Sequence, residues 1–222
     1  MLKVNYKIIT MPEEDYRRLP AISNSDLTTA KYLLAGIPQP KPQVAFKFGR
    51  AVHMALLEPE RWKIFSQDKE PELCAKVEEL AAFAMHNFPL QKMLAKSYTR
   101  KEQVVLWQCP STGIACKARL DLYRERQFIA DLKTTSASSR NEFLNHAEQF
   151  DYDRQLAFYG MILQPERYTL AGISKKKLGT VYFIHYFHQD RFIMRGRQKA
   201  IHLLQNLQKR PDIIRLVLQA RE

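Results

Sequence analysis

The chain has 222 residues and a mass of 26.0 kDa, with 45% hydrophobic and 26% charged residues. A chain of this length buries about 70% of its unfolded surface, so we expect one domain with an ordinary core. The longest apolar runs, such as residues 181–187, are far shorter than the roughly 20 residues that span a bilayer, which excludes an integral membrane protein. The first residues show no signal-peptide pattern, so we expect a cytoplasmic protein.

Basic residues are in large excess. The 35 Lys and Arg against 23 Asp and Glu leave a net charge of +12. Residues 191–222 hold eight basic and two acidic side chains, a net +6, so half of the surplus lies in this segment. A surplus this large favours a polyanionic partner such as nucleic acid, although basic surfaces also serve solubility.

The three cysteines are Cys74, Cys109 and Cys116. An odd number at irregular spacing supports neither a disulfide framework nor a four-cysteine metal site. We expect them to be small, partly buried hydrophobic residues.

The first part of the chain reads as helical. Polar capping residues at 23–26 and Gly36 predict a short helix over 27–34. Prolines at positions 38, 40 and 42 then predict an extended connector. Apolar residues recur at helical spacing twice more, which predicts helices over 48–56, before Pro59, and from 73 to near Pro89.

From about residue 102, the spacing of the apolar residues changes to that of β-strands. β-Branched and aromatic residues predict strands over 102–108, 114–123 and 128–134, separated by turns at 110–113 and 124–127. Three consecutive strands with short turns form an antiparallel meander. The remaining chain predicts helices over 140–147 and 153–163, a strand over 180–187, a turn at 188–190, and helices over 198–207 and 213–219. This order is typical of an α/β sandwich.

Asp131 and Lys133 give the clearest indication of a chemical site. On a strand, residues i and i+2 face the same way, so the carboxylate and the ammonium project side by side. The turn at 124–127 brings Asp121 back beside Asp131, and two close carboxylates favour a divalent cation such as Mg²⁺ or Mn²⁺. Lys133 could then orient or deprotonate a water and stabilise charge on phosphorus. Taken alone, the pattern is also compatible with a simple salt bridge at a strand end.

Five motifs in order give the pattern a context. The sequence resembles the PD-(D/E)xK phosphodiesterase superfamily, specifically its RecB-like branch and the nuclease domain of RecE-type exonucleases (exodeoxyribonuclease VIII). The resemblance covers roughly residues 20–205. The matching stretches are ISNSDL (22–27), FGRAVH with LEP (48–53 and 57–59), GIACKARLD (113–121), DLKTT (131–135) and YDRQLAFY (152–159).

The resemblance implies a site. It assigns the metal to His53, Asp121, Asp131 and the backbone carbonyl of Leu132, the catalytic lysine to Lys133, a water-mediated ligand to Glu102, and the QxxxY signature to Gln155 and Tyr159. Each assignment has an alternative. His53 could be a histidine packed in a helix, and Glu102 a solvated acid at a strand end. Gln155 and Tyr159 could serve ordinary helix packing. Arg119 could meet a phosphate or pair with Glu102.

The resemblance also implies a fold and a function. The fold is α/β and restriction-endonuclease-like: residues 1–222 form a single domain with a central mixed sheet and antiparallel meander flanked by helices, an N-terminal arm (1–20) and a basic C-terminal segment (191–222). The family's longer β region after Tyr159 is reduced here, where Lys175–Lys177 precede one clear strand.

The implied activity is a Mg²⁺- or Mn²⁺-dependent 5′ to 3′ exonuclease on linear double-stranded DNA, in phage-type recombination. The implied partners are DNA with a free end, a RecT-like annealing recombinase and further copies of the chain, commonly as a tetramer. The alternatives are a structure-specific or restriction-type endonuclease, or an inactive DNA-binding protein on the same fold.

Overall fold

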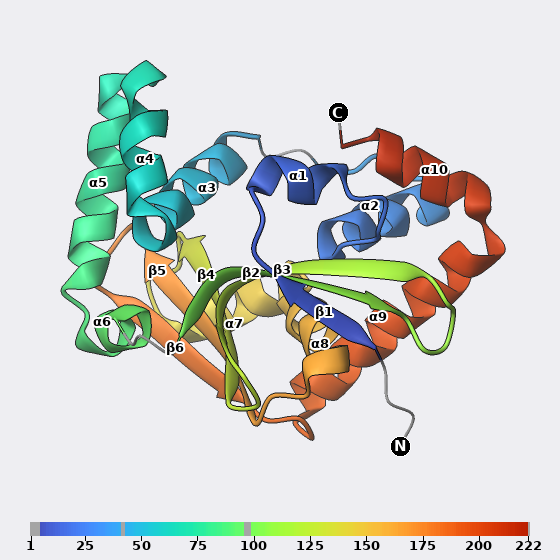
Figure 1. The fold of residues 1–222 in the computed structure, drawn as a ribbon. Helices are drawn as coiled ribbons and strands as arrows, with labels where there is room; N and C mark the ends of the chain where they lie inside the picture. The colour runs from blue at the N-terminus through green and yellow to red at the C-terminus, as the bar shows by residue number, and fades with distance from the viewer. Residues whose placement is uncertain (1–4, 41–42, 96–98, 222) are drawn as a thin grey trace.

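The computed structural model describes residues 5–40, 43–95 and 99–221. A six-stranded mixed sheet forms its centre, with the strands in sequence order (Figure 1). All neighbouring strands are antiparallel except β4 and β5, which are parallel. The strands are β1 (Tyr6–Ile9), β2 (Arg100–Gln108), β3 (Ala115–Arg124), β4 (Phe128–Thr135), β5 (Arg167–Ser174) and β6 (Val181–Tyr186).

The predicted meander is confirmed as β2, β3 and β4. A parallel pair requires a long crossover, because the chain must return to the same end of the sheet. Between β4 and β5 this crossover consists of α7 (Arg140–Gln149) and α8 (Tyr152–Leu163). The predicted α/β class, with a mixed sheet flanked by helices, is therefore confirmed.

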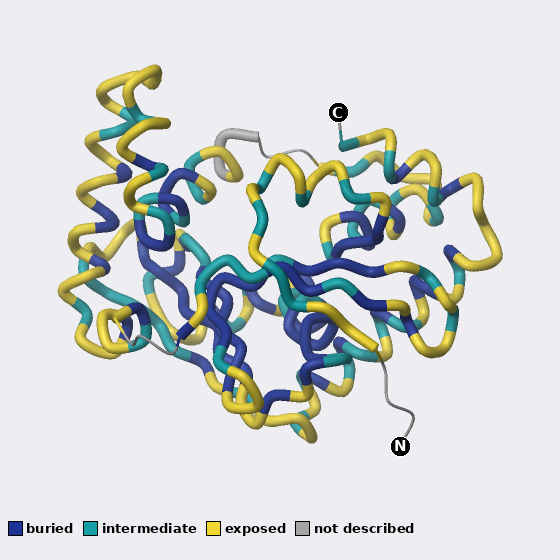
Figure 2. Tube along the Cα trace, in the orientation of Figure 1, coloured by how far each residue is buried: buried dark blue, intermediate teal, exposed yellow. Residues whose placement is uncertain are grey.

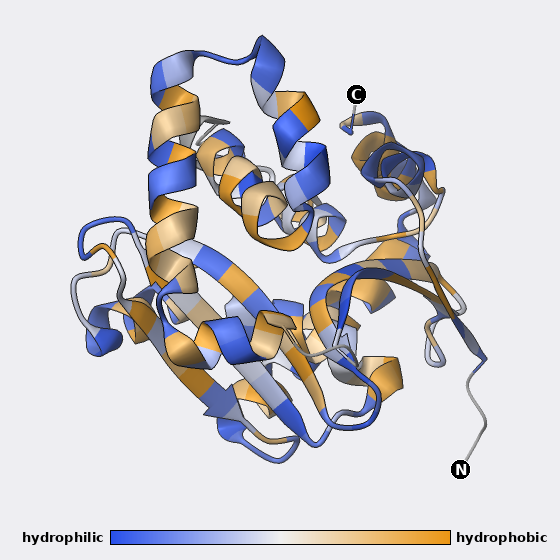
Figure 3. Cartoon of the chain, turned by 60° about the vertical axis from the view of Figure 1, so that its left-hand side comes forward, coloured by the Kyte–Doolittle hydropathy of each residue, from blue (hydrophilic) through white to orange (hydrophobic). Residues whose placement is uncertain are grey.

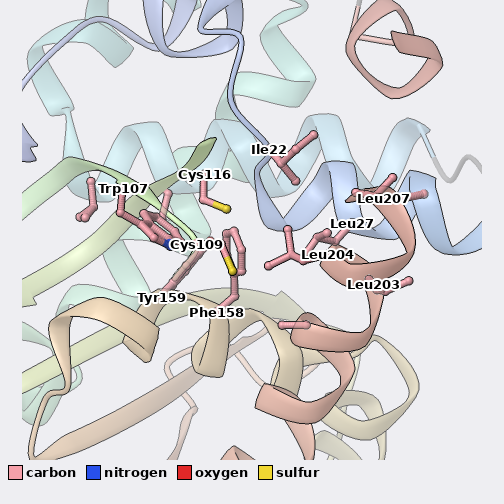
Figure 4. Packing of buried hydrophobic residues seen from close by; sticks show 14 of the residues in the cluster. Ile22, Leu27, Trp107, Cys109, Cys116, Phe158, Tyr159, Leu203, Leu204 and Leu207 are labelled. Atoms are coloured by element: carbon pink, nitrogen blue, oxygen red, sulfur yellow. The ribbon is translucent and has the colours of Figure 1, made fainter. Parts of the chain in front are cut away.

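Helices cover both faces of the sheet. One group packs with α8 against β2 and β3, and its core includes Trp107 and Phe158, whose ring centroids lie 4.9 Å apart (Figure 4). The other group packs against β4 and β5. The first group includes α2 (Asn24–Ala35), α9 (Arg191–Lys209) and α10 (Pro211–Gln219); the second comprises α3 (Gln43–Leu57), α4 (Pro59–Phe65), α5 (Pro71–Met85) and α6 (Phe88–Ala95).

Burial follows this layering. The strands are mostly buried, whereas the outer helices expose one side (Figure 2). Hydrophobic and hydrophilic residues alternate along the outer helices, as expected for amphipathic elements that cover a core (Figure 3). The three cysteines are free thiols, two of them buried and Cys74 partly buried, as predicted. Within the described ranges, no helix combines the length and apolar character that crossing a membrane requires.

The helix-ending signals act as predicted at α2. Ser23 and Asp26 form a reciprocal capping box, and Gly36 ends the helix in the left-handed conformation with φ of 66°. Pro38 and Pro40 lie in a segment that is neither helix nor strand, and Pro42 lies outside the described residues. The prediction that a helix ends near Pro89 was wrong, because α5 stops at Met85 and Pro89 is the second residue of α6.

Among the described residues, two strands (β1 and β5) and three short α-helices (α1, α4 and α6) were missed. The prediction of one clear strand after Tyr159 was wrong, since β5 precedes β6. Nearly all of β5 is buried, so it lacks the alternation that marks a half-exposed strand. It also contains Gly172, where a Cβ would lie 2.6 Å from the Phe143 ring. The N-terminal arm contains β1 and the short α1 (Glu13–Arg18), and α4 begins at Pro59 itself.

Candidate active site

The site lies where β3 and β4 separate. The two strands pair from Arg124↔Phe128 to Leu122↔Ala130, and Asp121 and Asp131 are the next residues on each strand. Here the Leu132 backbone N–H donates to the Asp121 carboxylate at 2.7 Å. The side chain of Asp121 therefore replaces a strand-to-strand bond and holds the two acidic positions next to each other.

One half of the site gathers potential cation ligands. His53 from α3, Glu102 from β2 and Asp121 from β3 offer ligand atoms that all lie within 4.8 Å of one another. The His53 Nδ1 atom is 3.5 Å from an Asp121 oxygen. Glu102 has a positive φ of 52°, which is unusual for a side-chain-bearing strand residue. A His with two carboxylates is a donor set that can hold a divalent cation.

The other half surrounds Asp131. The Lys133 ammonium lies 2.5 Å from one Asp131 oxygen, and the Gln155 amide donates to the other at 2.7 Å. The same amide donates to the Tyr159 hydroxyl at 2.8 Å. Gln155 and Tyr159 are one turn apart on α8, so this helix orients the carboxylate from the side opposite to α3.

The structure thus brings all eight sequence-predicted site residues into one region. Asp131 does not belong to the three-residue group of His53, Glu102 and Asp121, but it adjoins Leu132, whose amide contacts Asp121. Its Oδ2 atom is buried and has no correctly oriented hydrogen-bond donor among the described residues, although Lys133 lies close. An oxygen in that state can accept a cation, so the residues present fit a divalent metal.

Burial and charge shift the acid–base properties of the carboxylates. Burial raises the pKa of Asp131 to about 6, although Lys133 acts in the opposite direction. Burial and the nearby Asp121 raise the pKa of Glu102 to about 8. Burial would also raise the pKa of Asp121, but His53, Lys133 and the Leu132 amide together hold it below its usual value. Clustered acids without a counter-ion resist full ionisation, which is the condition that a bound cation relieves.

The two cationic groups respond in the opposite sense. Burial disfavours a charged His53, but the Asp121 carboxylate outweighs this effect and the pKa of His53 lies above its ordinary value. Burial likewise disfavours the Lys133 ammonium, and Asp131 again reverses the balance, so the pKa of Lys133 is raised. Lys133 is therefore a positively charged hydrogen-bond donor in this structure.

Of the two alternatives for Arg119, the structure shows the ion pair with Glu102. Its Nε atom lies 2.5 Å from the Glu102 carboxylate, and Nη2 donates to Glu58 at 2.9 Å. Glu13 of α1 lies 3.6 Å from the same guanidinium. Sequence reasoning missed the roles of Glu13 and Glu58. The only local signal was the position of Glu58 within the LEP stretch, directly after α3.

Residues 23–210 match the family described as a PDDEXK-like domain of unknown function (DUF3799). The match covers most of the chain, and the protein belongs to this family. The predicted PD-(D/E)xK superfamily and its restriction-endonuclease-like fold are thereby confirmed. No curated protein shows significant sequence similarity to the chain.

Several crystal structures match this chain over most of its length. A candidate exonuclease from Eubacterium rectale is 17% identical with a TM-score of 0.66, over 96% of this chain and 88% of that one. An alkaline exonuclease from Laribacter hongkongensis is 13% identical with a TM-score of 0.47, over 92% and 95% of the two chains. A phage-related exonuclease from Haemophilus somnus 129PT is 13% identical with a TM-score of 0.41, over 87% and 95%. At these identities, the likeness to the Eubacterium protein concerns the fold alone.

Proposed function

We propose that this protein is a metal-dependent deoxyribonuclease, specifically a 5′ to 3′ exonuclease that degrades linear double-stranded DNA in phage-type recombination. The observation that carries the proposal is the placement of Asp121, Asp131 and Lys133 at the separation of β3 and β4, facing His53. Membership of a PDDEXK-like family, the name of the Eubacterium relative and the net charge of +12 support it.

In this proposal Mg²⁺ or Mn²⁺ is held by His53, Asp121, Asp131 and the Leu132 carbonyl, with Glu102 as a further ligand directly or through water. Such a cation, when bound, polarises a non-bridging phosphate oxygen and neutralises charge that develops on the phosphodiester. The protein's part is to hold the carboxylates close together and in a fixed orientation.

Lys133 acts as a charged donor in this scheme. Because Asp131 keeps its ammonium protonated, Lys133 can donate to a phosphate oxygen and stabilise the negative charge of the transition state. The alternative role of deprotonating a water would require a lowered pKa, whereas the pKa of Lys133 is raised. Gln155 and Tyr159 act as positioning residues, since the amide of Gln155 holds the Asp131 carboxylate.

The proposal also includes the assembly and the partner that the family resemblance implies. Residues 1–222 act as one nuclease domain that forms a homo-oligomer, commonly a tetramer, and works beside a RecT-like annealing recombinase. A ring would make digestion processive and dependent on a free end. Light scattering measures the oligomer, and a pull-down with the recombinase measures the partnership.

The direct test compares substrates. Purified protein is incubated with linear duplex labelled at either the 5′ or the 3′ end and with covalently closed circles, in Mg²⁺ and in EDTA. We expect degradation of linear DNA in Mg²⁺, early release of the 5′ label, intact circles and no reaction in EDTA. Nicked circles would assign an endonuclease, and DNA binding without cleavage in either Mg²⁺ or Mn²⁺ would assign an inactive DNA-binding protein.

A further inference from the structure

An exposed aromatic ring lies next to the proposed active site. Phe150, at the end of α7, is 55% exposed, and its ring centroid is 6.0 Å from that of Tyr152, the first residue of α8. The Lys133 ammonium lies over the Tyr152 ring, 4.9 Å from the centroid. The rings of Phe150 and Tyr152 therefore extend outward from Lys133 toward solvent.

The segment that carries these rings is tightly held. Asp151, between them, has a positive φ of 54°, a conformation that costs energy for a residue with a side chain. Its carboxylate accepts hydrogen bonds from Lys31 of α2 and Lys199 of α9, each at 2.7 Å. The neighbouring Arg154 is almost fully buried and also contacts Asp151, at 3.4 Å. Three helices therefore fix the backbone that presents Phe150.

Lysines flank the segment that carries the rings. The side chains of Lys31 and Lys199 remain 49% and 36% exposed while they pair with Asp151, and the Lys133 ammonium lies over the Tyr152 ring. A solvent-exposed ring within a rigid, lysine-flanked segment matches the design of single-strand binding surfaces, in which bases stack on aromatic side chains and cations meet the backbone. His146 extends the row, with its ring centroid 5.9 Å from that of Phe150.

We propose that Phe150, supported by Tyr152, is a stacking platform for an unpaired base of the DNA strand whose phosphate reaches Lys133. This inference rests on the proposed function and adds to it the residue that holds the strand next to the scissile bond. Stacking is tolerant of sequence because every base has a π-face, which suits an enzyme that degrades DNA without sequence preference.

Two variants separate this role from folding. Phe150→Ala removes the ring from an exposed position, and Phe150→Tyr restores it. Phe187→Ala is the matched control, because Phe187 is 53% exposed and follows β6 beside Arg167, at the opposite end of β4 from Lys133. The probes are a duplex with a short single-stranded end bearing 2-aminopurine and the equivalent blunt duplex, both with Ca²⁺ in place of Mg²⁺.

We expect the wild-type protein to quench the 2-aminopurine fluorescence and Phe150→Ala to leave it unquenched. The affinity of Phe150→Ala for the single-stranded end should fall by about 5- to 150-fold, the equivalent of one lost stacking contact. Its affinity for the blunt duplex should stay close to that of the wild type, and Phe150→Tyr and Phe187→Ala should behave as wild type.

The outcomes distinguish the two proposals. If the wild type cleaves linear DNA but Phe150→Ala and Phe187→Ala bind the single-stranded end equally well, the stacking platform is wrong and the nuclease assignment stands. If quenching depends on Phe150 while no cleavage occurs in Mg²⁺ or Mn²⁺, the platform stands and the nuclease assignment fails. A wild-type protein that does not bind DNA overturns both.

Discussion

Asp131 is the residue at which the two halves of the site meet, because it contacts Lys133 and Gln155 and adjoins the Leu132 amide that holds Asp121. We expect Asp131→Asn to lose cleavage and to weaken Mn²⁺ binding by at least about 100-fold, since even residues behind a metal ligand contribute about 10- to 100-fold. Asn preserves shape and an acceptor for Gln155, so thermal unfolding should change little. Calorimetry and a cleavage assay check both, and wild-type activity in this variant would remove Asp131 from the site.

Lys133 is expected to affect chemistry and not metal binding. Lys133→Met keeps the length of the side chain but removes the ammonium, so cleavage should fall by about 10²- to 10³-fold, as for loss of one charged transition-state donor. Mn²⁺ affinity should persist or increase, because Asp131 loses a competing cation. A drop in Mn²⁺ affinity as large as that of Asp131→Asn would make Lys133 a structural residue instead.

Proton competition should make metal binding depend on pH. A ligand must be deprotonated to bind a cation. The pKa of Asp131 is raised to about 6, and that of His53 lies above its ordinary value of about 6.5. Lowering the pH through this range protonates both groups, and the pKa of Glu102, raised to about 8, acts in the same direction, so Mn²⁺ affinity should fall progressively from pH 8 toward pH 6. Calorimetry across this range tests it, and a constant affinity would contradict the ligand assignment.

At the scale of elements, α9 approaches α8 very closely at Gly196. A Cβ at this position would lie 2.0 Å from the Asp153 carbonyl oxygen of α8. Gly196→Ala should therefore lower the free energy of unfolding by about 3 kcal/mol, although Ala favours an isolated helix. Urea unfolding measures this, with Gln198→Ala on the exposed side of α9 as the control. Unchanged or higher stability would show that α8 and α9 can separate without cost.

Elements with a strong period were predictable, and elements whose structure depends on their neighbours were not. The meander and the helices α2 and α8 follow from alternation, caps and apolar stripes. Strand β5 has no alternation because both its faces are buried, and Gly172 serves the packing of Phe143. Period-based reasoning has no signal for either condition.

The same division applies to the site. Asp121, Asp131 and Lys133 lie on one hairpin, so local spacing was enough to place them together. The contact between Arg119 and Glu58 joins a strand to the residue before α4, and the contact between Lys133 and Tyr152 joins a strand to α8. Such contacts depend on how helices pack on the sheet, which single-sequence periodicity does not encode.

At the scale of the molecule, much of the basic surplus is used internally. In the C-terminal segment, Arg195 pairs with Glu148 and Asp153, and Lys199 pairs with Asp151 and Asp153. Further ion pairs hold Arg210 and Arg221. Net charge therefore overstates what this segment offers to a polyanion, and the position of exposed lysines relative to the site matters more.

Lys175–Lys177 are exposed lysines that lie near the site. They follow β5 and are exposed, and the Lys175 amide donates to the Thr135 carbonyl at 2.8 Å, at the same end of β4 as Lys133. Each phosphate contact contributes about −0.9 to the slope of log K against log salt. Replacing the three lysines by Gln should weaken binding of linear duplex and make the slope less steep by about 2 to 3.

The control removes the same charge elsewhere. Lys63, Lys69 and Lys76 are exposed on and around α4 and α5, which project from the body of the molecule (Figure 1). Their replacement by Gln also lowers the net charge by three but should leave the slope almost unchanged, because these lysines lie away from the site. Binding titrations from low to moderate salt decide the matter. Equal losses in both triple variants would mean that DNA responds to the overall charge of the protein, and a slope unaffected in either would place the DNA path away from both lysine groups.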